Sequence, residues 1–525
     1  MKTIPHPYQL EDATKAYELC LDVGFFGLLY KPGMRKTYTS LMINEFMYKN
    51  GHTNALFIIC PKNAIKVWKT QIPEHSELKA EWWVWESVKS KSDNYKNELR
   101  WYLTKGEYPV FIISCESLQT YNEVLMNTIQ LFIKERKVFE IIDESAKFKN
   151  GRSKRTERLL SFSHTPIARG ILNGTPTPKS IVDIWSQMEA LKRIFWKEGS
   201  LPVFESLYSF KIFVRSWDGK KGYEKTITRS DVNDLQDKLN DLNYRSILSD
   251  KQKIFKIKLE HDIDNYNIAL NRIESSLKDV QNQIAPYVFY RERDINVPPV
   301  QHIEIPFELS KEEVTVYKKL KKDLIYTNED GEIFTMKSKG SLFQKFRQIT
   351  GGAYDKNNPI VDLPSKIDAM LDDIETHEEN VLIITSYRAN IKSISKHLET
   401  IGPTATYFGD TSVAERDKII DDAKSGRLRF IVANSEAIGL GVDGLQNTFH
   451  MMYVYDIPIP PLTWEQIIFR LDRSGQEYSV VVKHFLAEID GNKTVDHRCL
   501  SLAKDKRDLQ SAFEKMSDSE FEESV

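Results

Sequence analysis

The sequence predicts an α/β protein with two parallel-sheet units and a helical middle, and the spacing of its apolar runs is the main reason. Short apolar runs alternate with helical patterns in the first third of the chain, and the same alternation returns in the last third. The runs are residues 25–30, 55–60, 110–114 and 139–143, and then 381–386, 430–434 and 452–455. Continuous apolar runs of this length are typical of strands buried on both faces of a parallel sheet.

The composition is that of a globular protein with more than one domain. A chain of 525 residues is too long for one hydrophobic core and predicts about two to four domains. Hydrophobic residues make up 41% and charged residues 28% of the chain, as in ordinary globular proteins. Because 73 Lys and Arg nearly balance 75 Asp and Glu, any surface that binds nucleic acid must be local.

The cysteines and the N-terminal sequence indicate the cellular compartment of the protein. Cys20, Cys60, Cys115 and Cys499 include no Cys-x-x-Cys pair, which argues against structural zinc and a disulfide framework. No basic segment with a following apolar run opens the chain, and no stretch approaches the ~18 apolar residues of a membrane span. We expect no membrane association, and a cytoplasmic protein of a bacterial or phage-infected cell, or a nuclear one in a eukaryote.

The middle of the chain contains a heptad pattern, which predicts a long helix. Its apolar positions alternate in spacings of three and four, at Ile263, Tyr266, Leu270, Ile273, Leu277, Val280 and Ile284. A helix that packs on its own domain is the more typical interpretation, and a partner-binding coiled coil is the alternative. Residues 296–300 break the helix, a strand-like run follows at 302–306, and we expect the acidic segment 517–524 to be disordered.

A phosphate-binding loop is indicated where the first apolar run ends. Gly33, Lys36 and Thr37 lie between the run that ends at Tyr30 and the helical pattern that follows. In such a loop the backbone N–H groups and the helix N-terminus bind phosphates, the Lys reaches the β- and γ-phosphates, and the Thr hydroxyl binds Mg²⁺. Arg35 stands where the usual loop has Gly, and Tyr30 stands where a first Gly or Ala is expected.

A carboxylate pair ends another apolar run. Asp143 is placed to coordinate Mg²⁺ and Glu144 to activate water, because both follow directly after a predicted strand. The alternative is a pair of residues that caps the next helix. Asn173 and Gly174, after the apolar Ile171 and Leu172, mark a further strand-to-turn junction, which is either a plain turn or a loop that senses the γ-phosphate.

Two arginines near the C-terminus have the spacing of catalytic groups. Arg470 and Arg473 are three residues apart and are expected on one side of a helix. Gln466 lies upstream in the same helical pattern. Fixed arginines commonly neutralise the charge that develops on a transferring phosphoryl group. The alternative is a solvated helix face.

Contacts to nucleic-acid phosphates are predicted at the ends of several strands and in one basic stretch. The stretch follows the carboxylate pair and includes Lys149 and Arg152, and a solvated loop is its alternative. Backbone amides and side-chain hydroxyls at strand ends commonly bind phosphates. The candidates there are Ser114, Ser386, Arg388, Asn434 and Ser435. Nothing in the sequence resembles a recognition helix or a zinc finger, so readout of bases is not expected.

Taken in order, these motifs resemble the superfamily-two helicases, and most closely the Swi/Snf-like DNA-dependent ATPases. The matching segments are Pro7-Tyr8-Gln9, Lys36-Thr37, Cys60-Pro61-Lys62-Asn63 with Trp68, Asp143-Glu144-Ser145-Ala146 with Lys149-Asn150, Asn173-Gly174-Thr175-Pro176, Gly439-Leu440-Gly441-Val442-Asp443, and Gln466 through Gln476. The resemblance implies that Gln9 contacts adenine, that Lys62 contacts DNA, and that Gly441 lies at the nucleotide. It also implies that Arg470 and Arg473 complete the site from the second lobe. Departures from the family pattern are Arg35 for Gly, Ala146 for His, Asn173 for Thr and Phe469 for Gly.

The resemblance implies two RecA-like lobes with a helical insertion between them. We expect a first, ATP-binding lobe at residues 1–215, a helical insertion at 216–300, and a linker at 301–360. A second lobe is expected at 361–490, and a C-terminal helix with an acidic tail at 491–525.

The implied activity is that of a DNA-dependent, helicase-like ATPase that uses ATP and Mg²⁺. It would translocate on duplex or branched DNA, held through the phosphate backbone, and remodel bound proteins or move branch points. The chain has little beyond the motor and resembles compact phage or bacterial members, which suggests replication, recombination or repair. Two alternatives stay open, a catalytically impaired nucleic-acid clamp on a helicase fold and an RNA helicase. Protein partners are not indicated.

Overall fold

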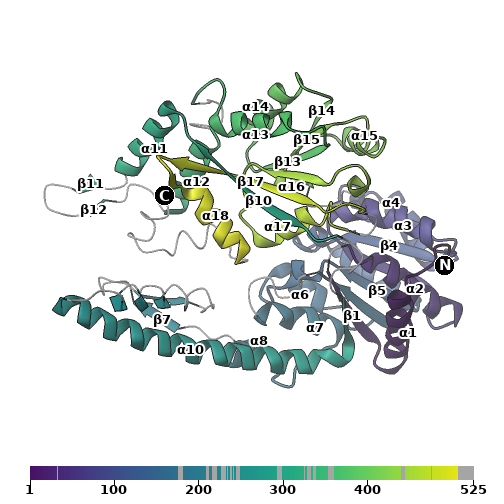
Figure 1. Ribbon diagram of the computed structural model, residues 1–525. Coiled ribbons are helices and arrows are strands. Elements are labelled where there is room, and N and C mark those ends of the chain that lie inside the picture. Colours follow the sequence, from purple (N-terminus) through teal and green to yellow (C-terminus); the bar gives the residue numbers. More distant parts are fainter. Residues whose placement is uncertain are drawn as a thin grey trace. The chain divides into compact units, whose positions relative to one another are not determined.

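The chain forms two compact units, shown in a computed structural model (Figure 1). The first unit comprises residues 1–31 and 35–292, and the second comprises residues 32–34 and 293–525. The structure describes residues 1–31, 33–174, 181–208, 249–291, 298–323, 339–352, 360–438, 444–473 and 476–505, with short pieces at 212–215, 222–225, 232, 235–236, 239–240, 242–243, 326–327 and 333–334. The acidic segment 517–524 lies outside the described residues.

The first unit is built on a parallel sheet with the strand order β3-β4-β2-β5-β6-β1-β9. Its strands are β1 (Phe25–Tyr30), β2 (Ala55–Cys60), β3 (Glu81–Val84), β4 (Pro109–Ser114), β5 (Val138–Asp143), β6 (Ala168–Leu172) and β9 (Val288–Arg291). The strands β1, β2, β4, β5 and β6 are buried throughout, as their continuous apolar runs predict. Because neighbouring strands are parallel, their carboxyl ends share one edge of the sheet, where α/β proteins place their ligand sites.

Helices connect these strands and cover the sheet. They are α1 (Pro7–Asp22), α2 (Lys36–Lys49), α3 (Ile65–His75), α4 (Asp93–Lys105), α5 (Glu123–Glu135), α6 (Lys154–Leu160), α7 (Trp185–Leu191) and α8 (Leu201–Tyr208). Helix α5 illustrates how a capping residue and an apolar face fix a helix in place. The Asn122 side chain accepts a hydrogen bond from the Leu125 N–H at its start, and Ile129 and Phe132 then pack in the same core as Phe57 of β2.

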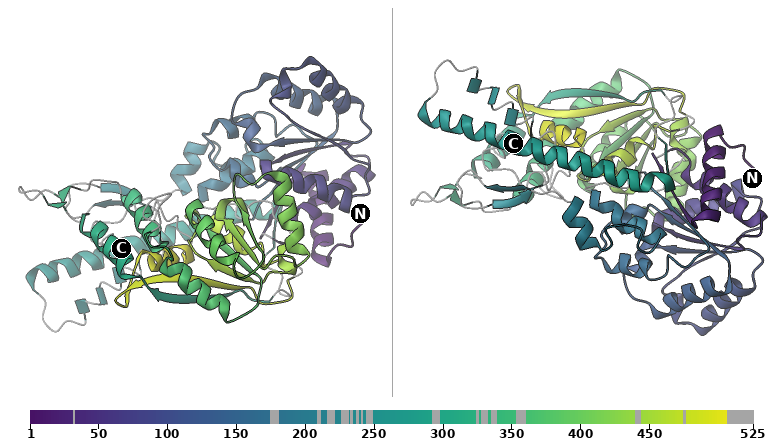
Figure 2. Two further views of the ribbon diagram at one scale, coloured as in Figure 1. Left: turned by 90° about the horizontal axis from the view of Figure 1, so that it is seen from above. Right: turned by 90° about the horizontal axis from the view of Figure 1, so that it is seen from below.

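The heptad pattern forms α10 (Asp250–Ile284), a single continuous helix that Figure 2 shows along its length. Its C-terminal Val280 and Ile284 are buried in the core of the first unit. Nearer its start, Leu259 and Ile263 pack in a small cluster that includes Leu239. Leu277, by contrast, keeps 37% of its surface exposed. These contacts favour the interpretation of a helix that packs on its own domain.

The boundaries between segments differ from the expected ones. Strand β9, inside the expected insertion 216–300, returns to the first sheet beside β1, and a short antiparallel pair, β7 (Ile212–Arg215) with β8 (Gly222–Lys225), precedes α10. Strand β10 (Gln301–Glu308), inside the expected linker 301–360, pairs along its whole length with β17 (Val481–Ile489) of the second sheet. The strand-like run predicted at 302–306 is thus a strand of the second sheet, although most of its residues are exposed.

The second unit contains another parallel sheet, in the order β10-β17-β16-β13-β15-β14. The remaining strands of this sheet are β13 (Val381–Thr385), β14 (Thr404–Tyr407), β15 (Phe430–Asn434), β16 (Met451–Val454) and β18 (Asn492–Lys493), the last of which runs antiparallel to β17. A separate short pair joins β11 (Tyr326–Thr327) and β12 (Ile333–Phe334). The predicted fold of two parallel-sheet α/β lobes is thereby confirmed.

Alternate residues of the second sheet face two separate cores. Leu382 and Ile384 of β13 belong to one core, whereas Val381 and Ile383 belong to the other, as the two-residue period of a strand requires. The first core includes residues of α11 (Lys311–Asp323), α12 (Lys339–Thr350), α15 (Val413–Lys424), α16 (Ser435–Ile438), α17 (Pro461–Ile468) and α18 (Val495–Lys504). The second includes residues of α13 (Ser365–Glu375) and α14 (Arg388–Leu398). Helices therefore cover both faces of the sheet.

Among the described residues, no helix combines the length and the apolar character that crossing a membrane requires.

Candidate active site and nucleic-acid interface

The candidate phosphate loop joins β1 to α2, and its geometry explains one departure from the usual pattern. Arg35 immediately precedes α2 and has φ 52° and ψ 44°, which is the left-handed region. Glycine is the default residue for that conformation because it has no Cβ, and another residue there costs about 1–2 kcal/mol. Arg35 adopts it nonetheless, with an exposed side chain. The chain therefore forms the turn without the glycine, and Lys36 and Thr37 still open the helix.

Tyr30, the second departure in this loop, is accommodated by contacts to two other elements. Its hydroxyl donates to the carboxylate of Asp12 on α1, and its ring is fully buried. Asp12 is also ion-paired to Arg291 at the end of β9, with 2.7 Å between Oδ1 and Nη2. The Tyr30 carbonyl oxygen accepts a hydrogen bond from Lys36 Nζ at 3.1 Å. A large residue at this position thus links the phosphate-loop lysine to α1 and β9.

Gln9 lies buried between α1 and α2. Its Oε1 accepts a hydrogen bond from the His6 backbone N–H at 2.9 Å, and its Nε2 donates to Thr39 Oγ1 at 3.4 Å. Both ends of the amide therefore hold the start of α1 in place beside α2. Contact of Gln9 with adenine stays a prediction.

Asp143 and Glu144 lie where β5 ends, at the same sheet edge as Lys36. Asp143 Oδ2 accepts a hydrogen bond from Trp68 Nε1 at 2.9 Å, and its Oδ1 accepts the backbone N–H of Glu144, also at 2.9 Å. Burial, together with the Glu144 charge, raises the pKa of Asp143 to about 6, although Trp68 and Lys36 oppose the rise. Glu144 has φ 49°, which turns the chain sharply as it leaves the strand.

Trp68 contacts a candidate metal ligand, which its place in a matching sequence segment did not predict. It is fully buried, and its indole N–H orients the carboxylate proposed to hold the metal. The only signal in the sequence was its place shortly after the Cys60-Pro61-Lys62-Asn63 segment. Asp12 and Arg291 had no local signal, since they are far apart in sequence and meet through the fold.

The ends of β5 and β6 are joined by a buried hydrogen-bond cluster. Ser145 Oγ donates to Gln187 Oε1 at 2.6 Å, and Asn173 Nδ2 donates to Ser145 Oγ at 3.2 Å and to Gln187 Oε1 at 2.9 Å. Asn173 stands where the related motif has Thr, and Ala146, which follows Ser145 in the chain, stands in place of the usual His. The serine and the amides connect the two motif segments where an imidazole is missing. Thr175 and Pro176 lie outside the described residues.

The donor set of this sheet edge fits a nucleoside triphosphate with Mg²⁺. Mg²⁺ is usually bound through one or two carboxylates together with substrate phosphates, rather than by an all-protein cage. Asp143 supplies such a carboxylate, and Thr37 supplies a hydroxyl at the start of α2, where backbone N–H groups favour anions. In the part of the chain that the structure describes, no three His, Cys, Asp or Glu side chains are grouped to hold a metal ion.

The arginine pair lies beyond the helix on which the sequence placed it. Helix α17 ends at Ile468, so Gln466 is helical, whereas Arg470 and Arg473 lie in the turns that follow. The expectation that both arginines share one side of a helix is therefore wrong. After the helix some backbone hydrogen bonds join residues three apart, as in a 3₁₀-helix. The Arg470 N–H, for example, donates to the Ile467 carbonyl at 3.0 Å. The buried Gln476 side chain braces this segment by donating to the Phe449 carbonyl at 3.0 Å.

Three of the predicted nucleic-acid residues meet at the carboxyl ends of β13 and β15. Ser386 Oγ and Ser435 Oγ are 3.4 Å apart, and Asn434 Nδ2 donates to the Ser386 carbonyl at 3.3 Å. Arg388 begins α14 close by in the sequence, and its exposed guanidinium pairs with Asp410. The fold thus brings hydroxyl and amide groups from distant segments to one edge of the second sheet.

The candidate nucleic-acid residues of the first unit have more varied surroundings. Ser114 caps a short turn by accepting the Ser117 N–H at 3.1 Å, so it already has a structural role. Lys62 is exposed after β2. In the basic stretch, Lys149 lies 3.9 Å from Asp183, and Arg152 forms a two-pronged ion pair with Glu205. Gly33 is described, whereas Gly441 lies outside the described residues.

Comparison with family models identifies the chain. The model of the SNF2-related domain matches residues 27–351, which is more than half of the protein, and the helicase conserved C-terminal domain matches residues 365–476. The chain belongs to the SNF2-related family. The SNF2-related and helicase C-terminal domains make it a helicase-like ATPase, which acts as an ATP hydrolase.

Relatives of this SNF2-family chain include bacterial and human proteins. It is 24% identical over 494 residues to the uncharacterized ATP-dependent helicase YqhH of Bacillus subtilis, covering 92% of this chain and 76% of the relative. It is 22% identical over 444 residues to the DNA repair and recombination protein RAD54B of Homo sapiens, covering 82% of this chain and 45% of that protein. The SWI2/SNF2 ATPase core of Sulfolobus solfataricus in complex with dsDNA is similar at 17% identity and a TM-score of 0.39, covering 100% of this chain and 97% of that one.

Proposed function

We propose that this SNF2-family ATPase is a DNA-dependent motor that translocates on duplex or branched DNA in replication, recombination or repair. The observation that carries the proposal is the carboxyl edge of the first sheet, where Asp143 ends β5, Glu144 follows it, and Lys36 begins α2 after β1. The relative named as a DNA repair and recombination protein supports the choice of DNA.

In this proposal the following residues bind and align ATP. Gln9 reads the adenine, and the backbone around Gly33 and Gly441 lies against the phosphates. Lys36 binds the β- and γ-phosphates, and Thr37 and Asp143 hold Mg²⁺, which neutralises charge on the transferring phosphoryl group. Glu144 orients the attacking water, because a carboxylate directly after the metal ligand can accept its proton.

Arg470 and Arg473 are proposed as the arginine fingers that stabilise the charge of the transition state, with Gln466 as their helical neighbour. In related phosphoryl-transfer enzymes, an arginine finger contributes about 10³–10⁵ in rate. Arg473→Ala is therefore expected to keep ATP binding and lose turnover. Loss of nucleotide binding instead would show that Arg473 serves the ground state and is not a finger.

DNA is proposed to bind through its phosphate backbone. The candidates are Lys62, Ser114, Lys149, Arg152, Ser386, Arg388, Asn434 and Ser435. Backbone contacts of this kind position a protein on nucleic acid without reading sequence.

The deciding experiment measures ATP hydrolysis by the wild type and by Lys36→Ala, each alone, with duplex DNA, with a branched DNA junction and with RNA. We expect hydrolysis that rises with DNA and is abolished in the variant, which should still bind DNA. Preferential stimulation by RNA would instead indicate an RNA helicase. DNA binding without hydrolysis under any condition would indicate a nucleic-acid clamp. Full activity of Lys36→Ala would remove the phosphate-loop assignment.

A further inference from the structure

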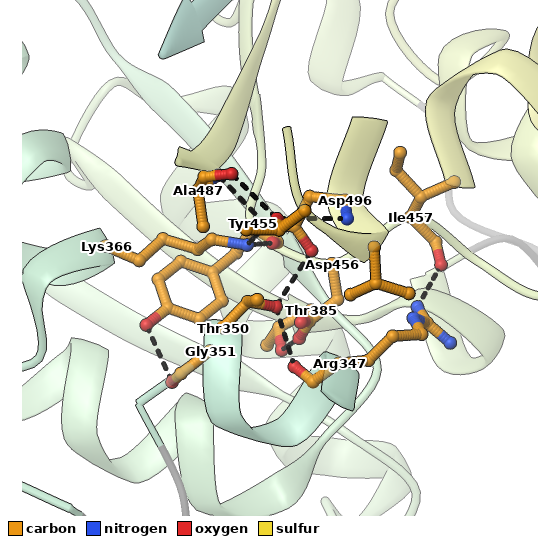
Figure 3. A network of polar contacts seen from close by, with 12 residues as sticks. Arg347, Thr350, Gly351, Lys366, Thr385, Tyr455, Asp456, Ile457, Ala487 and Asp496 are labelled. Atoms are coloured by element: carbon orange, nitrogen blue, oxygen red, sulfur yellow. Dashed lines mark hydrogen bonds and ion pairs between the residues drawn. The ribbon is translucent and has the colours of Figure 1, made fainter. Parts of the chain in front are cut away.

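The segment between β16 and α17 is held from several sides in the second unit (Figure 3). Lys366 Nζ donates to the Tyr455 carbonyl at 3.1 Å, and the Tyr455 hydroxyl donates to the Gly351 carbonyl at 3.0 Å. The Arg347 guanidinium donates to the Ile457 carbonyl. These contacts tie residues 455–457 to α12, to Gly351 just after it, and to α13.

Asp456, in the middle of this segment, binds a different part of the unit. Its Oδ2 accepts hydrogen bonds from the Thr385 hydroxyl, from the Ser386 backbone N–H at 3.4 Å and from Asn390 Nδ2 at 3.0 Å. Asp456 is only 5% exposed, and Asn390 is 3% exposed. A buried carboxylate is tolerated only when donors satisfy it, and bonds to an ionised group are among the stronger hydrogen bonds.

The donors to Asp456 all come from the junction of β13 with α14. That junction, residues 385–390, contains Ser386 and Arg388, and Ser386 in turn touches Asn434 and Ser435. Asp456 therefore fixes the backbone and the side chains around the group of residues proposed to contact DNA phosphates.

The same segment leads directly to the proposed arginine fingers. From Asp456 the chain continues through Pro460 into α17, which carries Gln466, and Arg470 follows in the next turn. A movement of the 385–390 junction would pull on Asp456, and hence on the entry to α17. Coupling of this kind travels through contiguous packed and hydrogen-bonded elements.

We propose that Asp456 is a positioning residue that couples nucleic acid bound at residues 386–390 to the arginine-bearing segment 461–473. The coupling makes hydrolysis respond to DNA. It rests on the proposed function, because it requires both DNA contact at the junction and arginine fingers after α17. It goes further by assigning the connection between them to one side chain that contacts neither ligand.

A neighbouring carboxylate in the same network has a purely structural role. Asp496 pairs with the buried Lys366 at 2.5 Å and accepts a hydrogen bond from Thr350 Oγ1 at 2.8 Å. It also accepts the Ala487 N–H, so it ties β17 and α18 to α12 and α13. Among the described residues, Asp496 makes no hydrogen bond or ion pair with the 385–390 junction, so burial in this network does not by itself imply coupling.

The test compares Asp456→Asn with Tyr455→Phe in the full chain. Asp456→Asn removes the charge that strengthens the hydrogen bonds from the 385–390 junction, whereas Tyr455→Phe removes one hydrogen bond of the same segment and leaves that junction unchanged. The readouts are the ratio of ATP hydrolysis with and without duplex DNA, the Kd for duplex DNA without nucleotide, and the Tm. We expect Asp456→Asn to lower the stimulation ratio about fivefold or more, since coupling between sites typically amounts to 5–150-fold. Tyr455→Phe should lower the Tm comparably and keep the ratio.

Thr385→Val is the second variant, in case Asp456→Asn does not fold. It removes one donor to Asp456 with little change in shape, and should lower the ratio in the same direction. An unchanged ratio in Asp456→Asn or in a folded Thr385→Val would overturn the inference while leaving the proposed function intact. An equal loss in Tyr455→Phe would overturn it too, because general loosening would then explain the effect. A wild type that no DNA stimulates would overturn the proposed function and the coupling with it.

Discussion

Two residues that leave strands of the first sheet have a backbone conformation that side chains usually avoid. Arg35 precedes α2 with φ 52°, and Glu144 follows β5 with φ 49°. Strained residues of this kind tend to cluster at functional sites, where the surrounding structure holds them. Both positions adjoin groups proposed to act on ATP, namely Lys36 and Asp143.

Arg35→Gly tests whether this strain is real. Glycine relieves the left-handed conformation but makes the unfolded chain more flexible, so we expect a net gain of about 0.5–1 kcal/mol in the free energy of unfolding. Chemical denaturation measures it, with ATP hydrolysis expected to persist. Asn50→Gly is the control, because Asn50 ends the same helix at φ −94° and should lose stability. A loss for Arg35→Gly as large as the control's would contradict the strain.

Trp68→Phe tests the orientation of Asp143. The variant keeps a buried ring but removes the indole N–H that bonds Asp143 Oδ2 and opposes the rise of its pKa. We expect the Mg²⁺ concentration for half-maximal hydrolysis to rise about tenfold, because residues that orient a metal ligand typically contribute 10–100-fold. Trp85→Phe is the matched control, since the Trp85 indole donates to Ser87. Equal Mg²⁺ dependence in both variants would show that Trp68 only packs and does not orient Asp143.

At the scale of elements, strands β5 and β6 place two charged residues inside the first unit. Glu140 is paired in register with Arg169, and both are buried. Among the described residues, neither carboxylate oxygen of Glu140 has a hydrogen-bond partner. Burial raises the pKa of Glu140 well above its usual value, although Arg169 opposes the rise. Folding therefore favours the protonated carboxyl group.

Glu140→Gln is expected to stabilise the protein at neutral pH. Since the folded pKa is raised, the wild type loses stability as pH rises from about 4.5 through the folded pKa, whereas Gln does not titrate. The advantage of the variant should grow over that window to about 1–3 kcal/mol in the free energy of unfolding. Denaturation at several pH values measures it, with the exposed Glu157→Gln as the control. A destabilised variant would show instead that Glu140 and Arg169 form a working ion pair.

At the scale of the whole molecule, the charge balance means that the proposed DNA contacts must be local. The formal net charge is −2, so the protein as a whole does not attract DNA. Affinity must come from particular cations, of which Lys149 and Arg152 are proposed candidates. Their carboxylate partners, Asp183 and Glu205, would be exchanged for phosphates, which is feasible because Lys149 lies as far as 3.9 Å from Asp183 and the Arg152 side chain is 62% exposed in its pair.

The double variant Lys149→Ala with Arg152→Ala should weaken DNA binding and flatten its salt dependence. Each phosphate contact contributes about 0.9 to the slope of log affinity against log salt, so the slope should fall by about 1–2. Binding titrations at several salt concentrations measure it. Lys15→Ala with Lys96→Ala changes the net charge equally at other exposed ion pairs and should leave the slope unchanged. An unaltered slope in the first variant would make the basic stretch a solvated loop.

Local patterns were enough to place the strands that are apolar throughout. The apolar runs 25–30, 55–60 and 430–434 coincide with β1, β2 and β15, because a strand buried on both faces must be apolar throughout. In a parallel sheet the residues that follow each strand share an edge. Lys36 and Asp143 were therefore predictable as neighbours from chain order alone.

Tertiary structure decided what depends on contacts between distant segments or on backbone angles. Strand β10, predicted as a strand-like run within a linker, belongs to the second sheet because β17 pairs with it, and α17 ends before Arg470, contrary to the helical spacing. The hydrogen bond of Trp68 with Asp143 and those of Asp456 with residues 385–390 join positions far apart in sequence. No local period encodes such pairs, because side-chain periodicity reports only which face of an element is buried. The partner on that face is chosen by the packing of the whole unit.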